Sequence, residues 1–237
     1  MTQYTYQERF RTVRGVFDEF TNRNLFELQS RNYFEELLRP LFIGKESNVF
    51  LASKGKKVVI VKIYRVQNAD FMGMYNYIKQ DPRYEFMKKQ RREIIFAWTQ
   101  REYKNLIKAK EGGVRVPEAH IFMQNILVEE FIGEGENPAR RLKDAFPEDP
   151  EEFLEEIVRQ MKLLYKCGLV HGDLSAFNIL NHKEKPVLID FSQGTVVKNA
   201  SSSELLQRDI KNVLQFFAKA GIRKNPEEIF KRVTAAD

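Results

Sequence analysis

The chain has 237 residues, of which 43% are hydrophobic and 30% are charged, which is typical of a globular protein and excludes collagen-like and disordered chains. A single cysteine excludes an intramolecular disulfide framework, and no segment reaches the roughly 18 apolar residues that a membrane-spanning helix needs. The N-terminal residues also lack an apolar signal segment, so we expect a soluble, cytoplasmic protein in a reducing compartment.

The net charge of +6 is unevenly distributed along the chain. Residues 132–237 are close to neutral, whereas residues 79–110 alone hold ten basic and four acidic side chains. Such a surface can attract the phosphates of a nucleic acid. A solvated helix face explains the same charge, and the charge taken alone favours this second interpretation.

The first part of the chain is predicted to form helices and then a sheet. Apolar residues at three- and four-residue steps over residues 10–20 and 24–38 indicate two helices. Short β-branched and aromatic runs then indicate three antiparallel strands, at 41–43, 48–51 and 58–61. Residues 68–90 have weak periodicity, and we expect a long mobile insertion there.

A strong helical pattern returns over residues 91–110. Further strands are expected at 114–116 and 121–132, and a linker at 133–135. The remainder is predicted to hold helices at 150–167, 203–220 and 225–233, with short strands near 178–180 and 187–189. This order, mostly β with one crossing helix and then mostly α, is the plan of a two-lobed phosphotransferase, although a plan alone does not establish a function.

The segment 169–180 carries the strongest chemical signal. An apolar strand end leads into His-Gly-Asp, and Asn178 follows Asp173 with the four intervening residues of kinase catalytic loops. In such loops the Asp faces the acceptor hydroxyl and the Asn binds Mg²⁺. Asp190 ends the next apolar strand, where a carboxylate is costly unless it is paired or binds a metal ion. The alternative is that both aspartates only cap turns, and the kinase spacing argues against it.

A second set of candidates lies in the first half of the chain. The loop over 44–47 has small and polar residues where a backbone could approach phosphate, but only one glycine, so it is not a G-x-G-x-x-G loop. Lys62 lies inside an apolar strand, as does the kinase lysine that holds the α- and β-phosphates and pairs with a helix glutamate. Glu102 is spaced best for that pairing, with Glu93 as the runner-up. An edge-strand lysine pointing at water is the alternative.

Asp209 is predicted to support the catalytic segment. By helical spacing it faces inward with Leu206 and Val213, where its carboxylate could accept hydrogen bonds from backbone N–H groups of the loop. The alternative is a surface ion pair with Arg208 or Lys211. His171 is predicted to be a structural hydrogen-bonding residue of the loop.

Three segments together resemble the RIO family of atypical serine/threonine protein kinases: 44–50, 171–180 and 189–194. The Gly-Lys-Glu-Ser-Asn loop and the Leu-Ser after Asp173 resemble the type-one branch, whereas Phe191 is more common in the type-two branch. Only about 40 residues precede the loop, too few for the winged-helix domain of the type-two branch. The resemblance covers nearly the whole chain, and we expect an archaeal member of the type-one branch.

The resemblance implies an α+β, two-lobed protein-kinase-like fold. A helical N-terminal extension over 1–40 would pack on the kinase, and a β-rich N-lobe over 41–131 would contain a flexible loop near 68–90. A truncated helical C-lobe over 132–237 would lack the activation loop and the substrate-binding helices of ordinary protein kinases.

The resemblance also implies residue roles. Asp173 would be the catalytic base, Asn178 and Asp190 would bind the metal ion, and Lys62 would hold the phosphates with Glu102 as its partner. The implied cofactors are ATP and Mg²⁺ or Mn²⁺.

The other implied nucleotide-binding residues lie in two segments. In the hinge over 128–133, the carbonyl of Glu130 and the amide of Ile132 would pair with the adenine edge. In the loop between the first strands, the resemblance implies contacts near the phosphates from these residues: Gly44, Lys45, Ser47 and Val49.

The function implied is that of an ATP-dependent, non-specific serine/threonine protein kinase, with autophosphorylation and ATPase activity, acting in maturation of the small ribosomal subunit. Its RNA would be the partner of the basic residues 79–110. One alternative is an ATP-switched assembly factor that hydrolyses ATP through an aspartyl phosphate on Asp190. Another is an aminoglycoside- or choline-type small-molecule kinase, but the short C-terminal half leaves little room for such a substrate.

Overall fold

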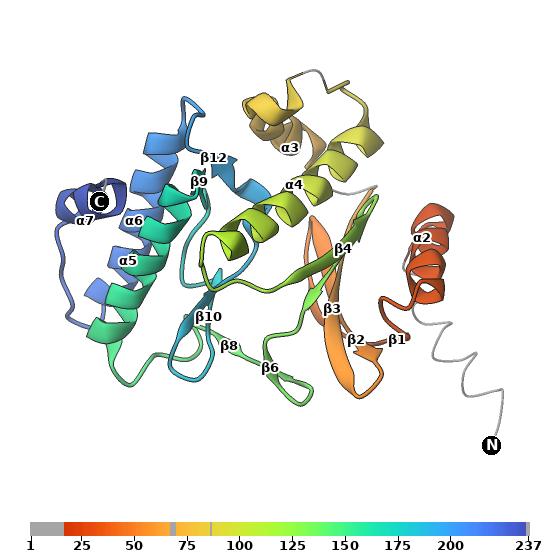
Figure 1. Cartoon of the computed structure of the whole chain (residues 1–237), viewed down its shortest axis with the longest axis horizontal. Coiled ribbons are helices and arrows are strands. Elements are labelled where there is room, and N and C mark those ends of the chain that lie inside the picture. The colour runs from red at the N-terminus through yellow and green to blue at the C-terminus, as the bar shows by residue number, and fades with distance from the viewer. Residues whose placement is uncertain (1–16, 67–69, 86, 236–237) are drawn as a thin grey trace.

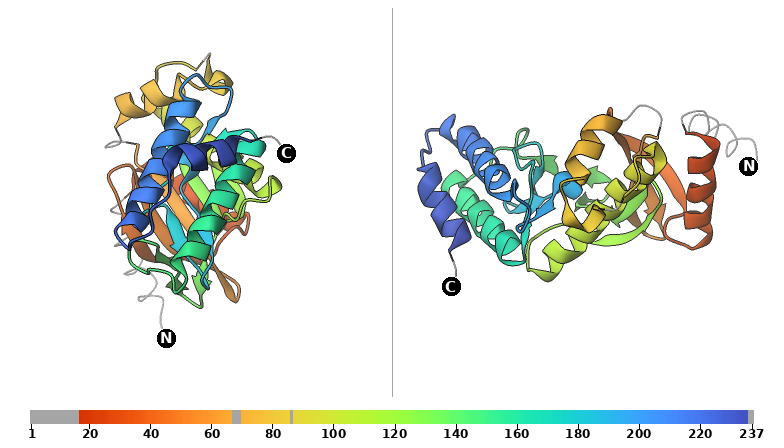
Figure 2. Two further views of the ribbon diagram at one scale, coloured as in Figure 1. Left: turned by 90° about the vertical axis from the view of Figure 1, so that its left-hand side faces the viewer. Right: turned by 90° about the horizontal axis from the view of Figure 1, so that it is seen from above.

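The computed structural model describes residues 17–66, 70–85 and 87–235. They form an α+β fold of two lobes, with a β-sheet towards one end and three packed helices at the other (Figure 1, Figure 2). The long helix α4 (Arg91–Glu111) runs between the two lobes. The two-lobed fold class and the predicted crossing helix are therefore confirmed.

The N-lobe is built on a five-stranded antiparallel sheet in the order β1-β2-β3-β5-β4. Its strands are β1 (Glu36–Ile43), β2 (Ser47–Lys54), β3 (Lys57–Tyr64), β4 (Ala119–Met123) and β5 (Ile126–Glu130). Since side chains alternate between the two faces of a strand, the β-branched run in β3 supplies both faces. One face packs against α2 (Glu19–Ser30), and the other carries Lys62.

The start of the sheet differs from the prediction. The helix expected over 24–38 ends at Ser30, and β1 already begins at Glu36, so the segment 1–40 contributes a strand as well as a helix. The helix ends where Asn32 adopts a φ of 61°, a left-handed conformation that asparagine tolerates. Pro40 is accommodated because β1 is an edge strand whose register shifts beside it. Most of the first predicted helix, over 10–20, lies outside the described residues.

The insertion near 68–90 is more ordered than the sequence predicts. It contains the helix α3 (Phe71–Ile78) and the 3-10 turn η1 (Pro82–Tyr84). Met74 and Ile78 are buried against Ile94 and Trp98 of α4. An eight-residue helix is too short to show a clear period, so only its packing on α4 reveals it.

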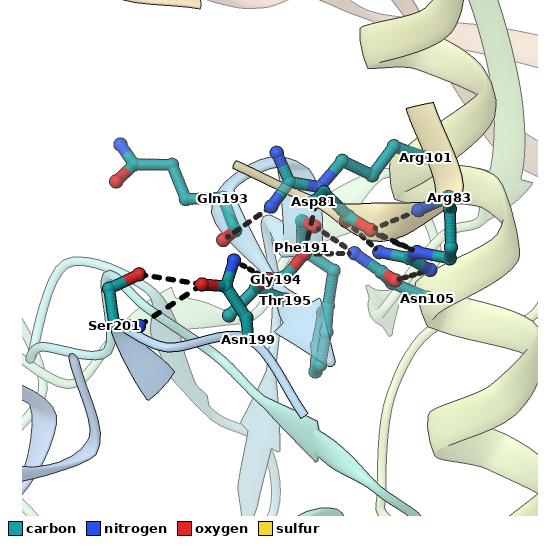
Figure 3. Close-up of polar contacts among 10 residues, drawn as sticks. All are labelled: Asp81, Arg83, Arg101, Asn105, Phe191, Gln193, Gly194, Thr195, Asn199 and Ser201. Carbon is teal, nitrogen blue, oxygen red and sulfur yellow. Dashed lines mark hydrogen bonds and ion pairs between the residues drawn. The ribbon is translucent and has the colours of Figure 1, made fainter. Parts of the chain in front are cut away.

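Asp81 joins this insertion to the rest of the protein. Its carboxylate is fully buried, 2.6 Å from Nη2 of Arg83 and 3.3 Å from Nε of the equally buried Arg101. Arg101 Nε also donates to the carbonyl of Gly194 at 3.0 Å. Asn105, one turn further along α4, donates to the same carbonyl at 2.8 Å. Figure 3 shows how the insertion, α4 and the loop around 191–194 meet in one polar cluster.

The C-lobe packs α5 (Pro150–Lys166), α6 (Ser202–Ala218) and α7 (Pro226–Thr234) around one apolar core. All three helices were predicted, and the two lobes share this core through Leu106 of α4. Since α6 begins at Ser202, the segment between Asp190 and that helix is short. No helix in the described ranges is long and apolar enough to cross a membrane.

Short strands complete the C-lobe and frame its loops. They are β6 (Gly133–Glu134), β7 (Asn137–Pro138), β8 (Arg140–Arg141), β9 (Leu169–Val170), β10 (Ile179–Asn181), β11 (Pro186–Leu188) and β12 (Thr195–Val196). The strands predicted near 178–180 and 187–189 correspond to β10 and β11. The segment 114–116 is not a strand, and the linker expected at 133–135 forms part of the β6–β7 hairpin. The 3-10 turn η2 (Phe191–Gln193) follows Asp190.

The buried charges around Asp81 give a prediction about stability. Asp81→Ala should lower the free energy of unfolding by about 3–5 kcal/mol, because it leaves the buried guanidinium of Arg101 without its carboxylate. Denaturant unfolding of the wild type and the variant measures this difference. In the control Asp144→Ala, which removes the exposed pair with Lys143, the loss should stay below about 1 kcal/mol. An equally small loss for Asp81→Ala would show that the cluster contributes little to stability.

Candidate active site

Lys62 connects the sheet, α4 and the C-lobe through a single ammonium group. It lies in β3, and its side chain is only 7% exposed. Its Nζ donates to Glu102 Oε1 at 2.7 Å and to Asp190 Oδ1 at 3.0 Å. The other carboxylate oxygen of Glu102 accepts a hydrogen bond from the Tyr64 hydroxyl. The partner of Lys62 on α4 is therefore Glu102 and not Glu93, and the alternative of a lysine pointing at water is wrong.

The charges of this cluster determine its protonation. Burial by itself would lower the pKa of Lys62, but Asp190 and Glu102 outweigh burial and hold it well above its usual value. Burial would likewise raise the pKa of Asp190. The Lys62 charge, with hydrogen bonds from Ser192 and Lys62, lowers it instead to about 2. Lys62 is therefore charged and Asp190 ionised at neutral pH.

The loop between β9 and β10 is held in place from α6. Asp209 accepts hydrogen bonds from the backbone N–H groups of Gly172 and Leu174, both at 2.8 Å. Burial raises the pKa of Asp209 to about 7, against the effect of these two hydrogen bonds. The prediction that Asp209 holds this loop is confirmed, and the alternative of a surface ion pair is wrong. His171 Nε2 lies 3.0 Å from the carbonyl oxygen of Ile189, which also confirms a structural role.

Asp173 and Asn178 face each other across this loop. Asn178 Nδ2 donates to the Asp173 carbonyl at 2.9 Å and to its carboxylate at 3.1 Å. Because Asp173 holds the amide nitrogen, the amide oxygen is the atom that Asn178 can offer to a metal ion. Burial, followed by the negative charge of Asp190, raises the pKa of Asp173. A carboxylate with a raised pKa is a better proton acceptor.

A cavity of about 640 Å³ lies between the lobes and brings most of the predicted site residues together. Its apolar walls include Leu41, Ile60 and Leu180, and such side chains can enclose a flat ring. Among the predicted residues, the following line it: Ser47, Val49, Lys62, Glu130, Ile132, Asn178 and Asp190.

Four predicted residues lie outside this lining. Glu102 supports Lys62 from α4, and Asp173 contacts Asn178. Gly44 and Lys45 lie in the turn between β1 and β2. A Cβ atom at Gly44 would lie 3.0 Å from the carbonyl oxygen of Ser47 and 2.6 Å from the Phe42 ring, so this turn is tightly closed.

Two residues of the site, Arg208 and Glu129, are not predicted by the sequence pattern. Arg208 donates from Nη2 to the carbonyl of Gly172, next to Asp173, but was considered only as a partner of Asp209. Glu129 also lines the cavity, although only its neighbour Glu130 was singled out. An acidic residue at the end of the apolar run of β5 is the signal that could have identified Glu129.

Oxygen donors for a metal ion are available at one end of the cavity. Asp190 supplies an ionised carboxylate, and Asn178 supplies an amide oxygen. Within the described ranges, no group of three or more His, Cys, Asp or Glu side chains could hold a metal ion alone. These two donors fit a hard ion such as Mg²⁺, which typically binds one or two carboxylates together with phosphate oxygens and water.

Comparisons with known proteins agree with this geometry. Residues 48–229 match the RIO domain family. The RIO-type serine/threonine-protein kinase Rio1 of Methanocaldococcus jannaschii is 39% identical over 231 residues, which cover 97% of this chain and 79% of that protein. The kinase of the same name from Haloferax volcanii is 35% identical over 228 residues, covering 96% and 79%. Both relatives are archaeal and carry the Rio1 name, as expected for an archaeal member of the type-one branch.

Among solved structures, the fold is similar to the Rio2 kinase of Chaetomium thermophilum in an ADP/Mg²⁺-phosphoaspartate complex. The TM-score is 0.68 at 19% identity, covering 90% of this chain and 66% of that chain, so this likeness concerns the fold. The sequence similarity extends over almost the whole chain. The chain therefore belongs to the RIO family of serine/threonine-protein kinases.

Proposed function

We propose that this chain transfers the γ-phosphoryl group of ATP to serine or threonine hydroxyls of proteins, its own chain included. The observation that carries the proposal is the meeting of Lys62, Asn178 and Asp190 at one cavity between the lobes. These residues come from β3 and from two loops of the C-lobe. A cation, an amide oxygen and an ionised carboxylate at one place are the groups that phosphoryl transfer uses.

The nucleotide would bind across the cavity. Its base would lie between the apolar walls, with its edge against the Glu130 carbonyl and the Ile132 amide. The turn with Gly44, Lys45 and Ser47 would cover the phosphates, and Lys62 would contact the α- and β-phosphates. Since Lys62 is already held by Glu102, its ammonium is positioned before the nucleotide arrives.

Asn178 and Asp190 would hold the metal ion, Mg²⁺ or Mn²⁺. When bound, this ion neutralises charge that develops on the transferring phosphoryl group. The chain contributes the orientation of both ligands. Asp173 fixes the amide of Asn178, and Lys62 and Ser192 hold the carboxylate of Asp190.

Asp173 would accept the proton of the attacking hydroxyl. Asp209 holds the backbone on both sides of Asp173, through Gly172 and Leu174, and so limits movement of the base. The raised pKa of Asp173 favours uptake of the proton.

An ATP-hydrolysing switch is a second candidate, and the position of Asp190 favours it. Its carboxylate lines the cavity. A solved structure with a similar fold, a Rio2 kinase, is a complex that contains phosphoaspartate. An Asp190 oxygen would attack the γ-phosphorus, the bond to ADP would break, and water would then cleave the acyl phosphate. Label from ATP that is acid-stable and on serine supports the kinase, whereas label that is lost in base or hydroxylamine supports the switch.

We also propose that the partner of the basic insertion is RNA of the small ribosomal subunit. Fewer basic side chains are available to RNA than the sequence suggests, because Arg101 is buried against Asp81 and the partly exposed Arg83 is paired with the same carboxylate. Exposed basic side chains remain at the end of the insertion and the start of α4: Lys88, Lys89, Arg91 and Arg92. Several of them lie over aromatic rings, as Lys89 does over Tyr75 at 5.1 Å.

The role of Asp173 gives a prediction about catalysis. Asp173→Ala should slow phosphoryl transfer to protein by at least about 100-fold, because the hydroxyl proton loses its acceptor, while ATP still binds. Transfer of labelled phosphate and calorimetric ATP titration measure the two effects. Asp149→Ala, which removes a carboxylate that caps α5, is the control and should keep its activity. Transfer at the wild-type rate in Asp173→Ala would exclude this base.

The role of Asp190 gives a prediction about the metal ion. Asp190→Asn should raise the Mg²⁺ concentration needed for half-maximal turnover by about tenfold or more, since one anionic ligand is lost. Nucleotide affinity without metal should change much less. Mg²⁺ titration of the initial rate at saturating ATP tests this. If the metal dependence stays unchanged, another residue must be the ligand.

The exposed basic cluster gives a prediction about RNA. Replacing Lys88, Lys89, Arg91 and Arg92 together by Glu should weaken binding to small-subunit particles and flatten its dependence on salt, because phosphate contacts release counterions. ATP turnover should be retained, since none of these residues lines the cavity. Unchanged affinity and an unchanged salt slope, with turnover intact, would mean that this cluster only solvates the helix.

A further inference from the structure

Glu129 lies in the wall of the nucleotide cavity. In the sheet it is opposite Ile60 of β3, and Leu127 is opposite Lys62. Because side chains alternate along a strand, these four residues share one face of the sheet, the face that carries Lys62. Ile60, Lys62 and Glu129 all line the cavity. Glu129 directly precedes Glu130 of the predicted hinge. Along β5 it therefore lies between Leu127, which is opposite Lys62, and the hinge.

The carboxyl group of Glu129 has no polar partner in the protein. No hydrogen bond or ion pair of the described residues involves it, and the nearby ammonium of Lys62 is already bound to Glu102 and Asp190. Burial, and then the charges of Glu102 and Asp190, raise the pKa of Glu129 to about 8, while Lys62 opposes this rise. An unpartnered carboxyl group beside other carboxylates is unfavourable. A donor on a bound ligand would offset that cost.

We infer that Glu129 selects the base of the bound nucleotide by accepting a hydrogen bond from an exocyclic amino group at position 6 of the purine. This inference rests on the proposed ATP binding at the same cavity. The amino group of adenine has two hydrogens, of which the Glu130 carbonyl takes one. The second hydrogen points to the other side of the ring, away from the hinge edge. Guanine has a carbonyl oxygen at this position, which has no hydrogen to donate to the carbonyl oxygen of Glu129.

The chemistry of the carboxyl group suits this contact in both protonation states. A carboxylate accepts through either oxygen, and a protonated carboxyl group still accepts through its carbonyl oxygen. A site built to receive an amino group rejects an analogue that lacks it, because its own polar group is then left unpaired. Selection by Glu129 therefore adds to the selection made by the backbone of the hinge.

A cycle of two nucleotides and two proteins isolates this contact. The nucleotides are ATP and purine riboside triphosphate, which lacks the 6-amino group, and the proteins are the wild type and Glu129→Met. We expect loss of the amino group to weaken binding to the wild type at least about tenfold more than binding to Glu129→Met. Glu129→Gln keeps a carbonyl acceptor and should restore most of this difference. Calorimetric titration without turnover measures all the affinities.

The outcomes separate this inference from the proposed function. If ATP binds the wild type but the penalty for the missing amino group is equal, within about twofold, in Glu129→Met, the inference is wrong. If the wild type does not bind ATP, the proposed function itself fails. Glu118→Met is the matched control, because Glu118 does not line the cavity, and it should keep the wild-type penalty. A selectivity change in this control equal to that of Glu129→Met would also overturn the inference.

Discussion

The arrangement of the two lobes depends on one buried ammonium group. Lys62 binds a carboxylate from α4 and another from the C-lobe, and its side chain is almost inaccessible to water. Removing the charges of Lys62 and Glu102 from water is costly, and a buried ion pair adds little net stability by itself. Such a cluster persists only where the surrounding structure holds its members in place. Here the sheet register positions Lys62, and packed helices position its partners.

Residues 101–105 of helix α4, little more than one turn, hold parts of both lobes in place. Glu102 points to the sheet and meets Lys62. Arg101 and Asn105 are four residues apart, so they share a helix face, and both donate to the carbonyl of Gly194. A Cβ atom at Gly194 would lie 2.8 Å from Nδ2 of Asn105, so this close approach requires glycine. A shift of α4 would therefore move Lys62 and the loop after Asp190 together.

The parts predicted well from the sequence are those whose chemistry is local. The Asp173–Asn178 spacing lies within one loop, and an apolar strand with one lysine marks Lys62. The inward position of Asp209 follows from the period of its helix. The start of β1 was predicted wrongly because its apolar residues also fit a helical period, and only pairing with β2 decides between the two.

Other features depend on contacts that sequence spacing does not reveal. Asp81 and Arg101 are twenty positions apart, and each looks like surface charge when residues 79–110 are simply counted. Their mutual burial removes one basic and one acidic side chain from the surface. The helix α3 has no clear period of its own, because its packing on α4 produces its order. Counts of charged residues along a sequence therefore overestimate how many charged side chains are exposed wherever buried pairs form.

Four acidic side chains of this protein divide into two groups, according to whether protein atoms satisfy their carboxyl groups completely. Asp209 accepts two backbone hydrogen bonds, and Asp81 is bound by two arginines, so both are complete without a ligand. Neither of them lines the cavity between the lobes. Glu129 lacks a partner, and the carboxylate of Asp190 reaches the cavity with part of its surface open. Enclosing a carboxyl group without a polar partner is costly, and a bound molecule that pairs with it offsets that cost. We therefore propose that the carboxyl groups without complete partners, those of Glu129 and Asp190, mark the nucleotide site.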